Sequence, residues 1–93
     1  KDNRNFNIND LKYTIQLYSD VNFENIENYK NKILKLKSEI IYTEELYIFS
    51  IYSQIGTDYF LTYKNFDKKN DALEHCKKLS FVKKCLILKP QNY

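Results

Sequence analysis

The chain has little of what most enzyme sites are built from: one His, one Gly, one Pro, two Cys, and neither Trp nor Met in 93 residues. A single glycine excludes the glycine-rich loops that cradle phosphates. A metal site needs three or four ligands that converge on one point, and beside His75 and Cys76 the only other thiol is Cys85. A Cys–His nucleophile needs a base held by a third group, which nothing near His75 and Cys76 suggests.

Paired carboxylates are equally poor candidates for acid–base chemistry. They lie in charged stretches without the apolar surroundings that raise a carboxyl pKa, as at Glu44-Glu45 and at Asp71 with Glu74. We therefore expect no catalytic residues, no metal, no cofactor and no enzyme activity.

Long hydrophobic runs are also missing. The longest uncharged stretch, Leu46 to Thr57, is too short and too interrupted to span a bilayer, and no secretory signal is visible. The chain begins at Lys1 rather than Met, and residues 1–10 have the composition of a polar linker. We expect one domain over residues 11–91, cut from a longer protein whose targeting sequence or membrane anchor lies upstream.

The net charge is only +3, although lysine is abundant. Lysines spread over helices usually form solvated faces, whereas a nucleic-acid binder concentrates basic residues on one face. We expect no nucleic-acid partner.

What is abundant is aromatic: nine Tyr and six Phe, residue types that favour sheet. A strand-like run followed by a turn and a helix occurs twice along the chain, with strands between and after. The expected elements are a strand at 12–18, a helix at 22–37 or longer, strands at 47–53 and 59–63, a helix at 68–79 and a strand at 84–89. This order predicts an α+β, βαββαβ fold of the ferredoxin-like or RNP-like kind: a four-stranded antiparallel sheet with two helices on one face and the other face open.

Local signals support these elements. Asn22 and Asp67 are each placed to cap a helix. Apolar residues recur at helical spacing from Ile26 to Ile40, and the only glycine, Gly56, lies in a hairpin turn predicted at 54–58. In the second helix, a buried face is expected to contain Ala72, Cys76 and Leu79.

The two cysteines have two possible states. In an oxidising compartment Cys76 and Cys85 could pair. Strand alternation favours free thiols: if Leu86 and Leu88 face the core, Cys85 points away from the helix that carries Cys76.

Three parts of the chain resemble SPOR (sporulation-related repeat) domains of the cell-division type. Tyr13-Thr-Ile-Gln-Leu-Tyr-Ser19 with Asn22-Phe-Glu-Asn-Ile26 is similar to the family's opening. Tyr59-Phe-Leu-Thr-Tyr-Lys-Asn-Phe66 with Lys68-Lys-Asn-Asp-Ala72 is similar to its third strand and second helix, and Leu88-Lys-Pro90 to its closing strand. The resemblance implies a non-catalytic module that binds peptidoglycan glycan strands stripped of stem peptides. It also implies a bacterial periplasm or cell envelope, often the division septum, where such a module localises a larger envelope protein.

The resemblance places Gln16 and Ser19 on the glycan-binding face of the sheet. Strand alternation agrees for Gln16, which lies opposite Ile15 and Leu17, and an amide can bind sugar hydroxyl and N-acetyl groups. The family's aromatic positions are occupied here by Asp58 and Ile87, and a common glycine by Lys64. Outward-facing Tyr18 and Tyr52 are the candidates for replacing the missing rings.

Two alternatives remain from sequence. The same fold with a degenerate glycan site would serve as a protein–protein interaction domain in an envelope assembly, which Asp58, Ile87 and a tyrosine-rich surface favour. A single-stranded RNA binder of the same outline stacks bases on a glycine-bearing third strand, and Tyr59–Phe66 contains no glycine.

Overall fold

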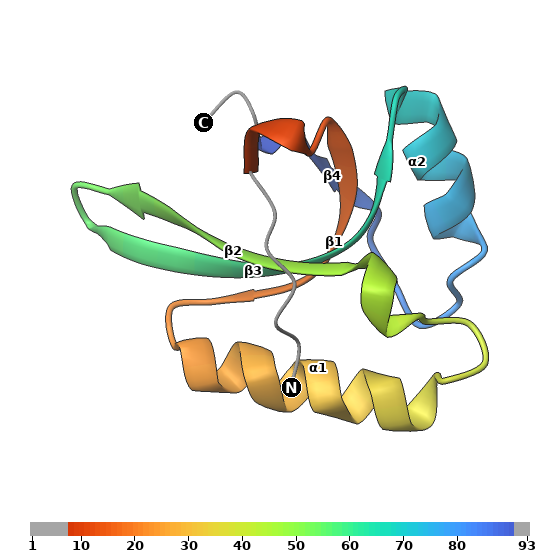
Figure 1. Ribbon diagram of the computed structural model, residues 1–93, viewed down its shortest axis with the longest axis horizontal. Coiled ribbons are helices and arrows are strands. Elements are labelled where there is room, and N and C mark those ends of the chain that lie inside the picture. Colours follow the sequence, from red (N-terminus) through yellow and green to blue (C-terminus); the bar gives the residue numbers. More distant parts are fainter. Residues whose placement is uncertain (1–7, 91–93) are drawn as a thin grey trace.

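The predicted βαββαβ fold is confirmed by a computed structural model that describes residues 8–90. Its elements are η1 (Ile8–Asp10), β1 (Tyr13–Asp20), α1 (Phe23–Leu36), η2 (Thr43–Glu45), β2 (Leu46–Ser53), β3 (Gly56–Phe66), α2 (Lys69–Lys77) and β4 (Leu86–Leu88). The four strands form one antiparallel sheet in the order β2-β3-β1-β4. Both helices pack against the same side of this bent sheet (Figure 1), which we call the helix side; the opposite side is the front face.

Most of the expected linker, residues 1–7, lies outside the described residues. Its last three residues form η1, which is attached to the end of β3. The Asn65 side chain donates from Nδ2 to the Asp10 carbonyl at 3.0 Å and accepts from the Lys12 backbone N–H at 2.8 Å. Domain packing therefore begins within the segment expected to be linker.

Helix α1 begins as its sequence predicts. Asn22 is extended, and its side-chain oxygen accepts from the Glu24 backbone N–H at 2.9 Å, which confirms the expected cap. Ile26 and Ile33 are buried, but the apolar stripe does not continue as helix. The chain leaves the helix after Leu36, which is 64% exposed, and a turn leads to η2.

The expected cap of α2 is wrong. The N-cap position is Lys68, which makes no side-chain capping bond, because α2 begins at Lys69 and Asp67 therefore precedes the cap. Asp67 instead lies 3.2 Å from the Lys12 ammonium. The buried face of the helix is as predicted, since Ala72, Cys76 and Leu79 are all buried.

Strand β1 carries a bulge that sequence alternation did not predict. Gln16 pairs with Thr62 but Tyr18 pairs with Leu61, so an extra residue lies between these two pairs. Bulges bend a strand and re-aim its side chains. Tyr18 consequently turns to the helix side, against the expectation that it shares the face of Gln16.

A second irregularity lies in β3 opposite the start of β1, where Tyr13 pairs with Phe66 and Ile15 with Tyr63. Within it Lys64 adopts a φ of 63°, a conformation that glycine adopts with less strain. Irregularities of this kind bend strands, and the sheet is bent (Figure 1).

The core lies between the sheet and the two helices. Its buried side chains come from β1, α1, the segment before η2, β2, β3 and α2, and from the turn after α2: Ile15, Ile26, Ile33, Ile41, Leu46, Leu61, Tyr63, Ala72, Cys76 and Leu79. Tyr63 is the largest of them, and its hydroxyl donates to the Ile40 carbonyl at 3.1 Å and accepts from the Tyr42 backbone N–H at 3.2 Å. Tyr63 thus ties the α1–β2 connection to the centre of the sheet.

The β2–β3 hairpin is longer than predicted and extends beyond the helices (Figure 1). Its loop is Gln54-Ile55, and β3 begins at Gly56, which pairs with Ser53. Gly56 has a φ of 141°, in the range that favours glycine, which accounts for the only glycine of the chain.

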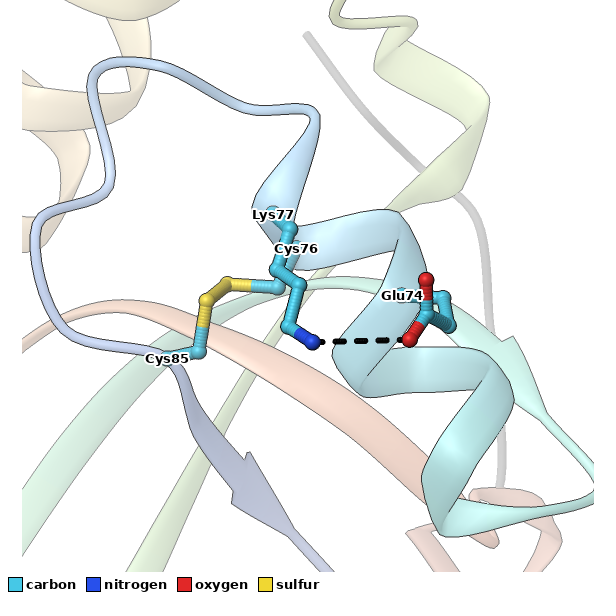
Figure 2. The surroundings of a disulfide bond; sticks show 4 residues. All are labelled: Glu74, Cys76, Lys77 and Cys85. Carbon is cyan, nitrogen blue, oxygen red and sulfur yellow. Dashed lines mark hydrogen bonds and ion pairs between the residues drawn. A yellow bond between two sulfur atoms is a disulfide. The ribbon is translucent and has the colours of Figure 1, made fainter.

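The expectation of two free thiols is wrong. Cys76 and Cys85 form a disulfide between α2 and the loop before β4 (Figure 2). The sequence argument assumed that Leu86 and Leu88 face the core. They pair instead with Gln16 and Thr14 on the front face, while Ile87 pairs with Ile15 on the helix side. Cys85, which precedes Leu86, therefore points to the helix side, where Cys76 lies.

Candidate functional site

The clearest polar feature of the front face is the pair Gln16 and Ser19. Both residues lie on β1, at the centre of the sheet, and the Gln16 amide donates from Nε2 to the Ser19 hydroxyl at 3.4 Å. Gln16 is half-buried and Ser19 exposed. The bulge lies between them, and it is the reason that two residues three positions apart both face the front.

Register places three further side chains around this pair. Across β3, Thr62 is opposite Gln16 and Phe60 is opposite Ser19; across β4, Leu86 is opposite Gln16. In antiparallel sheets, directly opposite residues point to the same face. We call Gln16, Ser19, Phe60, Thr62 and Leu86 the front-face site.

Sequence reasoning missed Phe60, Thr62 and Leu86, and of these Phe60 is the aromatic residue. It lies beside Ser19 on one strand and Phe49 on the other, and its ring stacks on that of Phe49 with centroids 5.5 Å apart. Strand alternation contained the signal, because Phe60 directly precedes the apolar Leu61, which faces the core. The ring supplies the aromatic surface that the expected positions lack.

Thr62 adds an unusual polar group. Its hydroxyl oxygen is buried and has no hydrogen-bond partner, whereas the neighbouring buried Thr14 donates its hydroxyl to the Tyr63 carbonyl at 3.3 Å. Most buried polar groups are satisfied, so a lone hydroxyl beside Gln16 is a noteworthy exception. The side chains of the front face thus differ in exposure: Thr14 and Thr62 are buried, whereas Ser19 and Leu86 are exposed.

The structure separates the six residues expected to bind glycan. Gln16, Ser19 and Asp58 share the front face, with Asp58 exposed two residues along β3 from Phe60. Tyr18 and Ile87 belong to the helix side. Tyr52 is 84% exposed and pairs with Thr57 near the hairpin tip. The alternation of β2 places it on the helix side as well.

Tyr18 has a structural role in place of the expected one. Its ring stacks on Tyr29 of α1 with centroids 4.5 Å apart, and its hydroxyl donates to Asp20 at 3.1 Å. Ile87 packs against the core cluster opposite Ile15. Neither side chain reaches the front-face site.

Asp20 fixes the turn that follows Ser19. It accepts from the Asn22 backbone N–H at 2.8 Å and from the Asn25 amide at 3.0 Å. The hydrogen bond from the Asn22 N–H, and to a lesser extent the one from the Asn25 amide, hold the pKa of Asp20 below its ordinary value. The hydrogen bond that the Tyr18 hydroxyl donates to Asp20 raises the pKa of Tyr18. The end of β1 is therefore rigidly attached to the start of α1.

The only histidine lies away from this site. His75 is half-buried on α2, with its ring 6.1 Å from that of Tyr63 and 5.6 Å from that of Phe66. Burial, with the nearby Lys64 charge, lowers its pKa. Among residues 8–90, no group of three His, Cys, Asp or Glu side chains is arranged to hold a metal ion.

Two further findings concern membrane crossing and similarity to known proteins. Neither α1 nor α2 is long and apolar enough to cross a bilayer, a statement confined to residues 8–90. No protein-family model, curated protein or solved structure matches this chain.

Proposed function

We propose that this domain is a non-catalytic module that binds peptidoglycan glycan strands stripped of stem peptides, through the front-face site. The observation that carries the proposal is the grouping of the Gln16 amide, the Ser19 hydroxyl and the Phe60 ring on one face. Apolar ring faces suit the C–H surface of a sugar, while an amide and a hydroxyl bind its hydroxyl and N-acetyl groups. Such a module would localise a larger bacterial envelope protein, in the periplasm and at the division septum.

Two further observations support this proposal. Gln16 and Ser19 match, by position in the SPOR resemblance, residues of the glycan-binding face, and both face the front. The Cys76–Cys85 disulfide is the state expected in an oxidising compartment such as the periplasm.

The test is a pelleting assay on peptidoglycan treated with an amidase that removes stem peptides. We expect the unmodified domain to sediment with treated material and not with untreated material. Gln16→Ala should weaken retention by about fivefold to tenfold, because one net hydrogen bond contributes about 1 kcal/mol. Phe60→Leu, which keeps an apolar side chain against Phe49, should weaken it as well.

The matched control is Gln54→Ala, which removes the same side chain from the exposed hairpin loop. It should bind like the unmodified domain. Absence of retention on treated peptidoglycan, or equal retention of the Gln16 and Gln54 variants, would contradict the proposal.

A second candidate function is a protein–protein interaction domain of an envelope assembly. It is favoured by the apolar hairpin tip, where Tyr52 is 84% and Ile55 is 97% exposed. Exposed aromatic residues are frequent interface anchors. Stoichiometric co-purification of a partner without glycan binding would select this candidate.

A further inference from the structure

Strand β2 is an edge of the sheet. It pairs with β3 on one side, and β3 is the one described element against which it packs extensively. An edge strand presents a row of backbone N–H and C=O groups to which another strand can bind. The last six residues of β2, Ile48–Ser53, lead into the projecting hairpin.

Among residues 8–90, this edge has none of the usual protection. Soluble proteins block edge strands with lysine, proline, bulges or short length. No charged residue or proline occurs from Leu46 to Thr57, and β2 pairs with β3 over eight consecutive positions without a register shift. The opposite edge differs: β4 has three residues and is followed by Lys89 and Pro90.

The hairpin geometry defines which backbone groups face outward. In a hairpin with a two-residue loop, the closing pair, here Ser53 and Gly56, exchanges both hydrogen bonds, and hydrogen-bonded residues then alternate along the strand. Ile48, Ser50 and Tyr52 therefore direct their backbone groups away from β3. Ser50 is exposed and lies in the middle of this series.

We propose that the β2 edge pairs in antiparallel fashion with the β2 edge of a second copy of this chain. The absence of charged residues from β2 favours a second copy as the partner. An uncharged strand gains nothing from a charged partner strand, but two copies of it meet without like-charge repulsion. Pairing centred on Ser50 sets Ile48 opposite Tyr52 of the other copy and brings the exposed hairpin tip, including Ile55, against the neighbouring molecule.

The same geometry determines what the dimer presents. Residues directly opposite in an antiparallel pair point to one face, so the two front faces lie on the same side of a continuous eight-stranded sheet. A polymeric ligand can then engage two front-face sites at once, which increases retention beyond that of one site. The pairing itself does not depend on any ligand, so its failure and the failure of glycan binding are separate results.

Sedimentation equilibrium of the 93-residue chain without ligand tests this proposal. With rising concentration, up to about 1 mM, the mass should move from 11.3 kDa toward twice that value. Ser50→Lys should raise the dissociation constant about tenfold or more, because it places like charges at the two-fold axis, whereas Ser50→Thr should pair like the unmodified chain.

A mixing experiment makes the test specific to self-pairing. Ser50→Lys and Ser50→Glu should each be monomeric alone and form a mixed dimer when combined. An unmodified chain that stays monomeric over this range overturns the proposal and leaves the edge to an extended strand of another protein. Equal association of the Ser50→Lys variant also overturns it, because the contact then lies elsewhere.

Discussion

At the scale of single residues, Tyr63 joins the sheet to the α1–β2 connection. It is fully buried, and its hydroxyl makes two hydrogen bonds to the α1–β2 connection. Tyr63→Phe keeps the ring but leaves the Ile40 carbonyl and the Tyr42 N–H without this partner. We expect a loss of about 1–3 kcal/mol in the free energy of unfolding, measured by urea denaturation.

The control is Tyr52→Phe, at an exposed position, which should leave stability unchanged. A pH series adds a second readout. Burial raises the pKa of Tyr63 above its ordinary value of 10.0, so this tyrosine ionises at lower pH in the unfolded chain than in the folded one. The contribution of Tyr63 to the free energy of unfolding is therefore constant below pH 10.0 and decreases above it. The decrease should be less steep in the Tyr63→Phe variant, which lacks this ionising group. Equal stability of both variants would contradict the role of this hydroxyl.

In the first half of β1, before the bulge, residue orientations were predictable from sequence because the strand keeps its period of two. Ile15 and Gln16 fall on opposite faces as expected. The alternation fails at Tyr18, because the bulge adds one residue and no glycine or proline marks it. For the same reason Phe60, rather than Tyr18, supplies the ring of the front-face site.

At the scale of elements, the two helix starts offer a matched comparison. Asn22→Ala removes a side chain that accepts from the Glu24 N–H, and should lower the free energy of unfolding by about 0.5–2 kcal/mol. Asp67→Ala removes only an exposed ion pair with Lys12, which contributes about 0–1 kcal/mol. Chemical denaturation of both variants measures the difference; a larger loss at Asp67 would contradict the cap assignment.

The elements themselves were predictable, and their ends less so. Apolar periodicity located both helices and the hairpin. It could not show that α1 stops after Leu36, because the end depends on Ile41 and Tyr63 packing the following turn into the core. The disulfide was missed because strand β4 is short and both of its faces are apolar, which left its register undetermined by pattern.

At the scale of the whole molecule, one small core must hold a sheet whose other face carries the site. A domain of this length has a free energy of unfolding of about 5–14 kcal/mol. The disulfide joins α2, which packs on the core, to β4, which places Leu86 beside Gln16. Stability and the shape of the front-face site are therefore linked through one covalent bond.

Reduction of that bond should weaken both properties. Closing a loop of this length stabilises by about 2–3 kcal/mol in the chain-entropy account. The Cys76→Ser/Cys85→Ser variant should therefore lose that much free energy of unfolding and unfold at a lower urea concentration. A reductant should add the mass of two hydrogen atoms to the unmodified chain and lower its retention on amidase-treated peptidoglycan, because β4 pairs with β1 over only three positions. The same reductant should leave the double variant unaffected. No mass change on reduction, or an unfolding midpoint equal to that of the variant, would show that the two cysteines are not joined.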